Sequence, residues 1–312
     1  MPGPPRPGDP PVPGGDQVTG PASPATVPTM ERPGDEPAGR AAAESGVLAA
    51  RLACAERAAS DSRQRLLEIS EQAAEERHVS TALREAVMPG PGTTIDLPHA
   101  RVTVRYVPAS ARTGLGGDWY DAGLLPDGRA VLAIGDVAGH GLPTIARMTR
   151  LRHALTGLAM TGASPGRLLA WLDGLVLQRM PETTATAVVG LLDPATGVFT
   201  WGQAGHPAPV LVRDGAAVQL DPPAGVLLGS GCGLPYEPAE VRLRTGDRLL
   251  LFTDGLVERR ARDIDEGLAL VLDAAEGLPR GDLGTGLDRL IETACGGIPE
   301  DDVCLLAVDV LG

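Results

Sequence analysis

The chain has 312 residues, of which 43% are hydrophobic and 21% charged, a composition typical of a folded protein with room for about two domains. No apolar run approaches the ~18 residues of a membrane span, and the first ten residues, MPGPPRPGDP, lack the apolar core of a secretory signal. The net charge is −13 and all 27 basic residues are arginine, without a local basic run, so we expect neither nucleic acid nor a membrane as partner. The four cysteines show no CxxC spacing, which favours the reducing cytoplasm over a disulfide framework or a zinc module.

The first predicted segment, residues 1–40, is an arm rich in proline and glycine. Residues 1–39 contain 12 Pro and 7 Gly. Such a composition buries too little apolar surface to offset the entropy lost on ordering, so the arm is predicted to be disordered. We interpret it as an inert tail rather than a docking arm.

A long helix is predicted over residues 41–89, where proline is absent until the final Met-Pro-Gly-Pro-Gly segment and Ala, Glu and Arg dominate. Apolar residues recur at alternating spacings of three and four, which is the pattern of a coiled-coil seam. The main members of this seam are Leu48, Leu52, Leu66, Ile69, Leu83 and Val87. Because Ser62, Glu76 and Ser80 interrupt it, two alternatives stay open: a helix folded against its own domain, or a homodimer through residues 41–88. We favour a regulatory dimerisation helix.

Residues 98–312 are predicted to form one domain of antiparallel strands and helices. Strands are expected at 102–106, 119–125, 129–136 and 303–310, and helices at 142–160, 165–179 and 282–295. Turn signals that predict hairpins occur at 126–128, 193–197, 214–215 and 245–247. The fold class is therefore α+β: two antiparallel sheets packed together and flanked by helices, preceded by the long helix.

Acidic residues at strand ends are the candidates for chemistry. Asp118 follows two glycines and opens a strand, Asp136 closes one, Asp254 follows an apolar strand, and Asp301 and Asp302 precede the last strand. An aspartate at a strand end, beside glycine that allows close backbone approach, is a suitable ligand for a hard cation. Taken singly, an Asp-Gly pair after a strand is more often only a turn. If several converge on one edge of the sandwich, they would hold two divalent ions.

Four segments in chain order carry a resemblance to a known family: GGDWYDAGLLPDGRAVLAIGDVAGHGLPTIARM, WGQAGHPAPVLV, GDRLLLFTDGLVE and DDVCLLAV. Together they resemble the ordered motifs of the bacterial PPM-type serine/threonine phosphatases. The subgroup is that of the sporulation stage II E phosphatase and the stress-response sigma-regulator phosphatases. The resemblance covers residues 98–310 and implies that 98–312 is a phosphatase domain with an αββα sandwich fold.

The resemblance also implies a centre of two Mn²⁺ or Mg²⁺ ions. Residue by residue, Asp118 matches the aspartate of the first motif, and Asp136 matches the aspartate that bridges both metals. Asp254 and Asp301 match two further ligands, and Val137 stands where a backbone carbonyl is a ligand. Two such ions lower the pKa of a shared water and neutralise phosphoryl oxygens, so that no covalent phosphoenzyme is needed.

Several positions depart from the wider family. Asp302 occupies a position that is often Asn, so we expect it to support a ligand rather than to be one. Arg112 is not at the spacing of the phosphate-binding arginine of eukaryotic-type members, and Ala138 stands in place of their proposed general acid, a histidine. We interpret His140 as a structural residue at a helix start and His206 as a residue that shapes its loop. The general acid stays open.

The function that the resemblance implies is hydrolysis of phosphoserine or phosphothreonine on a phosphorylated anti-anti-sigma protein, which would control a sigma factor. Two alternatives stay open. The acidic cluster alone would also serve a two-metal phosphodiesterase or nucleotide hydrolase, although the ordered motifs disfavour this. A catalytically weak phosphoprotein-binding scaffold is disfavoured because all four metal aspartates are present.

Overall fold

The computed structural model describes residues 36–87, 92–108, 116–279, 281–297 and 299–312. The chain divides into two compact units, residues 1–66 and residues 67–312. Helix α1 (Glu36–Val87) runs through both. Residues 1–35, which make up most of the predicted arm, lie outside the described residues.

Helix α1 is a single helix of 52 residues that begins at Glu36, within the segment predicted to be an arm. Its Ala, Glu and Arg residues are strong helix formers, which accounts for its length. From Glu44 to Glu75 every side chain is exposed except the half-buried Ala73. Exposed side chains of the predicted seam include Leu48 (70%), Leu66 (68%) and Ile69 (64%). No helix in the described part of the chain is long and apolar enough to cross a membrane.

Two antiparallel sheets form the centre of the second unit. The six-stranded sheet has the order β1-β2-β11-β10-β7-β8 and the five-stranded sheet the order β3-β4-β5-β6-β9. The strands of the first are β1 (Thr94–Leu97), β2 (Ala100–Val107), β7 (Val210–Arg213), β8 (Ala216–Gln219), β10 (Arg248–Phe252) and β11 (Val303–Val310). Those of the second are β3 (Trp119–Leu124), β4 (Ala130–Val137), β5 (Ala185–Asp193), β6 (Val198–Ala204) and β9 (Ala239–Arg242). Because β1 pairs with β2, the sheet begins four residues before the predicted start of the domain.

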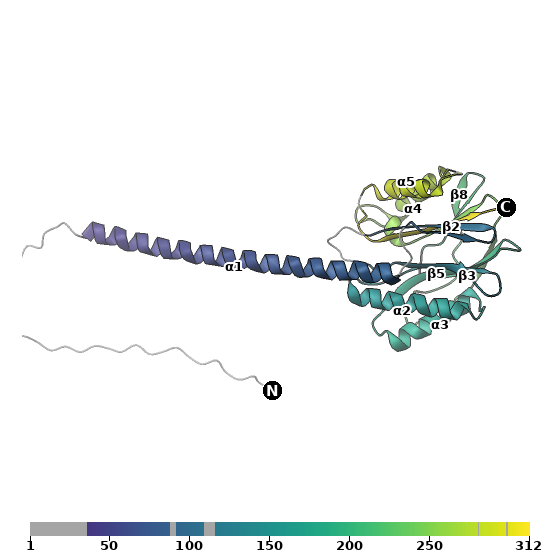
Figure 1. Cartoon of the computed structure of the whole chain (residues 1–312), viewed down its shortest axis with the longest axis horizontal. Coiled ribbons are helices and arrows are strands. Elements are labelled where there is room, and N and C mark those ends of the chain that lie inside the picture. The colour runs from purple at the N-terminus through teal and green to yellow at the C-terminus, as the bar shows by residue number, and fades with distance from the viewer. Residues whose placement is uncertain (1–35, 88–91, 109–115, 280, 298) are drawn as a thin grey trace, which may run out of the picture. The chain divides into compact units, whose positions relative to one another are not determined.

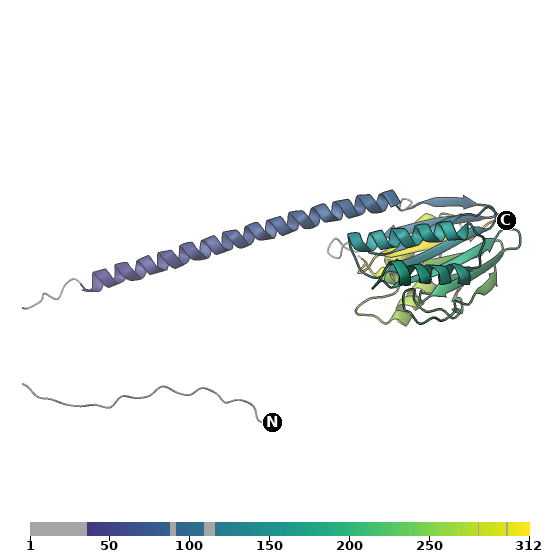
Figure 2. The same ribbon diagram turned by 90° about the horizontal axis from the view of Figure 1, so that it is seen from below.

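Helices cover the outer face of each sheet (Figures 1 and 2). Helices α2 (Leu142–Ala159) and α3 (Pro165–Arg179) pack on the five-stranded sheet, with α2 on β3 and β4 and α3 on β5 and β6. Helices α4 (Ile264–Glu276) and α5 (Leu283–Cys295) pack on the six-stranded sheet. The predicted sandwich of two antiparallel sheets flanked by helices is thus confirmed.

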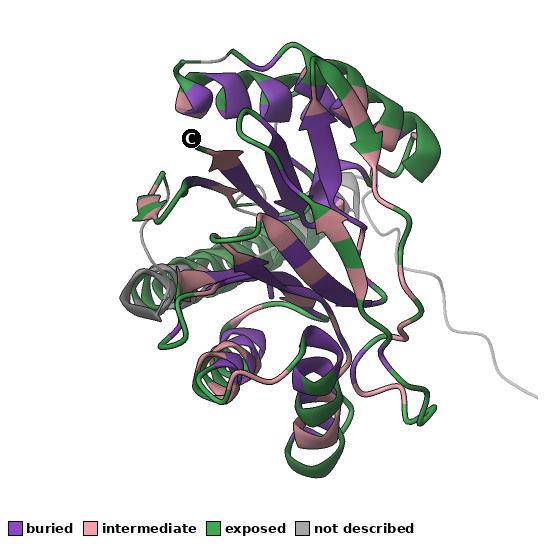
Figure 3. Ribbon diagram, turned by 90° about the vertical axis from the view of Figure 1, so that its right-hand side faces the viewer, coloured by how far each residue is buried: buried purple, intermediate pink, exposed green. Residues whose placement is uncertain are grey.

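Two hydrophobic cores hold these layers together, and Figure 3 shows the buried inner surfaces of the strands in purple. The larger core lies between the sheets and beneath α2 and α3, and the smaller lies between the six-stranded sheet and the α4–α5 pair. Strand β10 serves both: Leu249 and Leu251 belong to the larger core, and Leu250 and Phe252 to the smaller. A strand buried on both faces reads as a continuous apolar run, which explains the sequence Leu-Leu-Leu-Phe before Asp254.

Three of the four predicted hairpins are confirmed. They are the β3–β4 turn at 126–128, the β5–β6 turn at 193–197 and the β7–β8 turn at 214–215. The fourth prediction is wrong, because 245–247 connects β9 of the five-stranded sheet to β10 of the six-stranded sheet. The chain does turn there: Gly246 has a φ of +90°, and Asp247 accepts hydrogen bonds from the Arg213 guanidinium and the Arg244 amide. A turn motif specifies a change of direction but not the sheet that the next strand joins.

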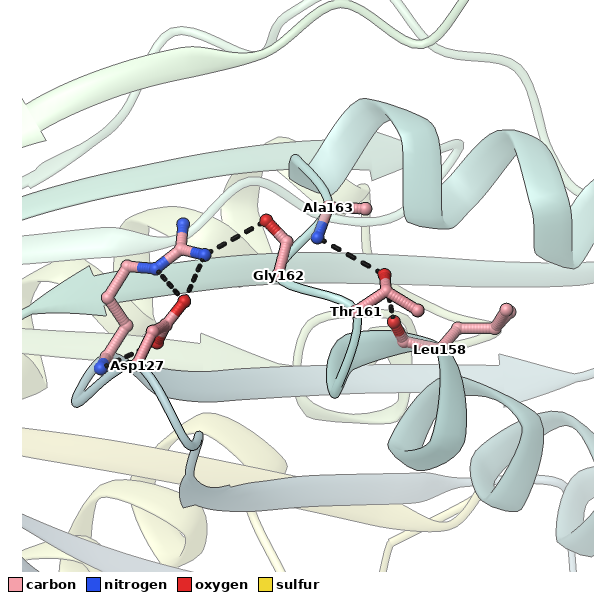
Figure 4. A network of polar contacts seen from close by, with 6 residues as sticks. Asp127, Leu158, Thr161, Gly162 and Ala163 are labelled. Atoms are coloured by element: carbon pink, nitrogen blue, oxygen red, sulfur yellow. Dashed lines mark hydrogen bonds and ion pairs between the residues drawn. The ribbon is translucent and has the colours of Figure 1, made fainter.

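A polar network ties the first hairpin to the connection between α2 and α3 (Figure 4). The Arg129 guanidinium donates to the Asp127 carboxylate at 2.5 and 2.9 Å and to the Gly162 carbonyl at 3.0 Å. In the same connection, the Thr161 hydroxyl donates to the Leu158 carbonyl at 2.7 Å and closes the end of α2. The network therefore holds the α2–α3 pair on the edge of the five-stranded sheet.

Candidate functional site

The four predicted site aspartates lie at strand ends, two from each sheet, and Val137, the fifth predicted site residue, is the last residue of β4. Asp118 directly precedes β3, and Asp136 is the next-to-last residue of its partner β4. Asp254 follows β10 and opens the short helix η1 (Asp254–Leu256), and Asp301 lies two residues before β11, the partner of β10. In an antiparallel pair the start of one strand lies beside the end of the other. Each sheet therefore presents its two aspartates together.

Two glycines bring backbone segments into close contact at these strand ends. A Cβ on Gly117 would lie 2.0 Å from the carbonyl oxygen of Val137, and a Cβ on Gly255 would lie 2.1 Å from that of Asp302. Any side chain at these positions would force the segments apart. The Val137 amide also donates to the Gly117 carbonyl at 3.2 Å. The peptide that follows Asp136 is thereby held against the segment that carries Asp118.

A hydroxyl group links the two sheets at the site. Thr253, at the end of β10, donates from Oγ1 to the buried Asp118 carboxylate at 2.7 Å. The same oxygen accepts a hydrogen bond from the Cys304 amide at 2.9 Å. Sequence reasoning did not single out Thr253, although its place beside Asp254 in the Thr-Asp-Gly motif was an available signal.

The two consecutive aspartates before β11 have different surroundings. The Asp302 carboxylate is buried and accepts hydrogen bonds from the Tyr106 hydroxyl and, at 2.9 Å, from the Gly116 amide. Asp301 is exposed, and its carboxylate accepts from the Asp302 amide at 2.8 Å. This arrangement favours the expectation that Asp302 supports the site while Asp301 faces a ligand. Nothing in the sequence pointed to Tyr106.

Burial and like charge perturb three of the aspartates. Burial, followed by the charge of Asp136, raises the pKa of Asp118 well above its usual range. Burial, followed by the charges of Asp254 and Asp301, raises the pKa of Asp136 to about 7. Burial and the Asp301 carboxylate also raise the pKa of Asp254. These pKa shifts reflect burial and repulsion between nearby carboxylates. An added cation would reduce that repulsion.

The donor set fits divalent cations. Carboxylate and backbone carbonyl oxygens are the ligands that Mg²⁺ and Mn²⁺ prefer. Among the residues that the structure describes, no three Asp, Glu, His or Cys side chains already form a ligand cage. The aspartates are instead close enough for their negative charges to repel one another. Bound cations would attract these carboxylates and so offset the repulsion.

His206 joins the two sheets as a structural residue. Its ring is buried, with Nε2 3.0 Å from the Phe252 carbonyl oxygen and Nδ1 2.8 Å from the Thr186 hydroxyl. Because a carbonyl only accepts, Nε2 carries the proton and Nδ1 accepts from Thr186. Burial lowers the pKa of His206 to about 4, so the ring is neutral near pH 7. These contacts support a structural role for His206, and the prediction that it shapes its loop stays a prediction.

Three other positions singled out from the sequence have less defined roles. Ala138 and His140 are exposed in the segment between β4 and α2. Arg112 lies outside the described residues. The structure therefore identifies no general acid among its described residues.

The two flanked sheets, with aspartates at their strand ends, form a fold that is also found in a solved PP2C domain. A family model described as Stage II sporulation protein E (SpoIIE) matches residues 126–311, more than half of the chain. The chain belongs to this family.

Similar proteins agree with this assignment. The phosphoserine phosphatase RsbU of Bacillus subtilis (strain 168) is 28% identical over 153 residues, which are 48% of this chain and 45% of RsbU. The solved RsbU and RsbW domains of Rv1364c from Mycobacterium tuberculosis match at 35% identity and a TM-score of 0.63, over 69% of this chain and 62% of that chain. The SiaA-PP2C domain of Pseudomonas aeruginosa shares the fold, with a TM-score of 0.59 and 19% identity over 78% of this chain and 96% of that domain. The chain spans less than half the length of RsbU and less than two thirds of the Rv1364c structure.

Proposed function

We propose that this chain is a phosphoprotein phosphatase that hydrolyses phosphoserine or phosphothreonine with two divalent cations, Mn²⁺ or Mg²⁺. The observation that carries the proposal is the placement of Asp118, Asp136 and Asp254 at strand ends of both sheets, close enough for their charges to act on one another. Membership of the SpoIIE family supports it, as does similarity to a relative named phosphoserine phosphatase.

Each site residue has a role in this proposal. The carboxylates of Asp118, Asp136, Asp254 and Asp301 would hold the two cations, with Asp136 at the position that matches the bridging aspartate of the family. The backbone carbonyl of Val137 completes the donor set. When bound, cations of this class supply a water of lowered pKa and neutralise phosphoryl charge. The protein itself orients the ligands through the Thr253 hydroxyl and the glycine contacts between backbone segments.

We further infer that the substrate is a phosphorylated anti-anti-sigma protein and that its dephosphorylation controls a sigma factor. The resemblance to the sigma-regulator phosphatases supports this substrate. The solved relative that carries an RsbU domain and an RsbW domain in one structure is consistent with the same kind of signalling.

The chain is proposed to consist of an arm, predicted over 1–40 and overlapping α1 from Glu36 onward, a helix (41–89) and a phosphatase domain (98–312), and to form a homodimer through residues 41–88. The exposed apolar seam of α1 supports the dimer, because pairing would bury side chains that a single helix leaves in water. The side chains of Leu83 and Val87, at the end of the seam, lie outside those described. A cytoplasmic location is part of the proposal, because the cysteine spacing in the sequence favours a reducing compartment.

The test is a phosphatase assay on p-nitrophenyl phosphate and on phosphorylated anti-anti-sigma proteins from the same cell. We expect activity with Mn²⁺ or Mg²⁺, its loss in EDTA and its recovery when metal is restored. Alkylation of the cysteines should change the rate little, because no thiolate is the nucleophile. Full activity in metal-free buffer would contradict the mechanism. Faster turnover of bis(p-nitrophenyl) phosphate than of any monoester would favour a phosphodiesterase instead.

A further inference from the structure

A surface groove runs between α2 and α3, in the helical layer that covers the five-stranded sheet. It has a volume of about 660 Å³. Its walls include His153, Gly157 and Leu158 of α2, and Trp171, Gly174 and Arg179 of α3. None of these residues belongs to the acidic site, so the groove is a separate feature of the fold.

Two glycines in the walls of the groove are not required by packing inside the chain. Glycine is among the poorest helix formers, yet Gly157 and Gly174 both lie within helices. A Cβ on either one would meet no atom within 4 Å. Gly166 of α3 is different, because a Cβ there would lie 2.2 Å from the Tyr236 carbonyl oxygen. At 157 and 174, the missing side chains leave open space at the surface of the groove.

The rim of the groove is cationic in an otherwise acidic protein. Of the charged residues of α3, Arg179 lines the groove, Arg167 stacks on the Trp171 ring, and one aspartate is present, whereas the chain has a net charge of −13. The aspartate, Asp173, is half-buried and accepts a hydrogen bond from the Gly229 amide at 2.7 Å. Arg167 and Arg179 are exposed, and neither forms an ion pair within the described residues. A partner with carboxylates beside the groove would meet complementary charge.

Trp171 forms a flat apolar wall at the surface. It is 36% exposed, and the Arg167 guanidinium carbon lies 5.0 Å from the centre of its ring. Stacking of this kind holds the ring and the cation together, with the apolar face and the charge side by side. Exposed tryptophan and arginine are the residues most enriched at binding hot spots.

We propose that this groove binds one α-helix of a partner protein, with small apolar side chains on the face that enters the groove and Asp or Glu residues on its flanks. The walls are helices whose backbone groups are bonded internally, so they offer no edge to which a strand could add. A helix brings its own backbone hydrogen bonds already made, and the open positions at Gly157 and Gly174 allow it to approach closely. The concave surface fits a helix better than a membrane, which takes up apolar side chains that project.

The test uses Trp171 as a reporter in the full-length chain. The chain has three tryptophans, and Trp119 and Trp201 are 0% and 1% exposed, so a blue shift of emission on binding reports Trp171. The probe is a labelled helical peptide of about 18 residues, or five turns, with Ala and Leu on one face and Glu on the flanks. We expect saturable binding by anisotropy, a blue shift that Trp171→Phe removes, and no binding of a matched peptide with Lys in place of Glu.

Substitutions in the groove distinguish an effect on peptide binding from an effect on the stability of the fold. Gly174→Leu should weaken the peptide about tenfold or more by filling the groove, while the melting temperature is kept or raised. Gly281→Leu, also at a position with no atom within 4 Å of a Cβ, is the matched control and should bind normally. Arg167→Glu with Arg179→Glu should shift the preference toward the Lys peptide.

Three results would overturn the proposal. The first is no response to the acidic peptide up to about 1 mM, the weak limit of specific binding. The second is a Trp171 blue shift that depends on protein concentration alone and is lost in Gly174→Leu, because the occupant is then a second copy of the chain. The third is binding to anionic lipid vesicles without binding to the peptide, since a membrane is then the partner.

Discussion

Single charged residues are buried in two different ways in this fold. In the Arg213–Asp247 and Arg248–Asp309 pairs, opposite charges lie 2.5 and 2.6 Å apart, and each pair joins segments that are distant in sequence but adjacent in the six-stranded sheet. At the strand ends of the candidate site, carboxylates lie near other carboxylates, and each raises the pKa of the next. The first arrangement contributes to holding the fold together. The second weakens the metal-free fold, a cost that the cations of the proposed site would offset.

We expect Asp136→Asn to abolish turnover while leaving the metal-free protein at least as stable as the wild type. The pKa of Asp136 is raised from 3.8 to about 7, so the folded state holds the proton more tightly than the unfolded state does. This carboxyl therefore destabilises the fold as pH rises through that interval, and the gain from Asn should appear near pH 8 and vanish below about pH 4. Thermal melts in EDTA measure the stability. A retained rate above about a tenth of wild type, a barrier change of only ~1.4 kcal/mol, would contradict the bridging role.

A buried pair between α2 and β3 gives a second prediction. The Arg152 guanidinium donates to the Tyr120 carbonyl at 2.9 Å and lies 3.5 Å from the Asp121 carboxylate, which also accepts from the Thr156 hydroxyl. The Arg152 and Asp121 side chains are only 12% and 11% exposed. Arg152→Ala should therefore cost about 3 kcal/mol in urea unfolding, because a buried carboxylate loses its cation. The double variant with Asp121→Asn should lose less than the sum of the single changes; additive losses would show that the pair is not coupled.

The neutral state of His206 predicts a pH dependence of stability. Its folded pKa of about 4 lies below the ordinary 6.5, so the unfolded chain binds the proton first as pH falls. The contribution of His206 is thus complete above about pH 6.5 and is lost toward pH 4, by roughly 3 kcal/mol. His206→Gln should remove this component, so the difference in unfolding free energy between wild type and variant should narrow as pH falls over this range. A constant difference would mean that the buried ring does not titrate as inferred.

At the scale of elements, strand β10 and helix α1 are opposites. All five residues of β10 are buried, because each face of the strand packs on a different core. Between Glu44 and Glu75, helix α1 buries no side chain fully. An isolated helix draws little stability from propensity alone, so tertiary or intermolecular packing must supply the rest. The exposed apolar side chains of α1 provide the surface for that packing.

The dimer proposed for α1 can be tested by introducing charged residues into the apolar seam of the helix. Leu66→Glu with Ile69→Glu should convert a dimer to a monomer, because pairing would bury unpaired carboxylates. Leu67→Glu is the matched control: Leu67 is similarly exposed (58%) but lies outside the seam, and this variant should stay dimeric. Light scattering gives the mass in solution. A wild-type protein that is already monomeric at micromolar concentration would rule out the dimer.

At the scale of the whole molecule, most features that depend on nearby residues were predicted correctly from the sequence. Features that depend on residues far along the chain were not. The turn signals at 126–128 and 214–215 predicted hairpins well, and the helix expected at 165–179 matches α3, because the causes of these features lie within a few residues. Helix α4 was not predicted, although Asp263 caps it by accepting from the Asp265 amide. The crossing at 245–247 was mistaken for a hairpin because the choice of sheet depends on residues far along the chain.

The candidate site shows the same division between local and distant causes. Motif resemblance identified Asp118, Asp136 and Asp254 by position, and the structure brings these three close enough to perturb one another. The hydrogen bond from Thr253 and the contact of Gly117 with Val137 were not predicted, since each joins segments that only the fold brings together. The positions of residues in the sequence do not reveal which backbone atoms come into contact in the folded chain.

The position of β11 in the sheet has a consequence for folding during synthesis. It is the last strand along the chain, yet it lies between β2 and β10, with eight residues paired to β2 and five to β10. The hairpins of the five-stranded sheet can form as they leave the ribosome, whereas the six-stranded sheet must wait for its central strand. Until then two apolar strand edges are open to pairing with other chains, so a nascent or truncated chain that ends before Val303 should be the species most prone to aggregate and most dependent on chaperones.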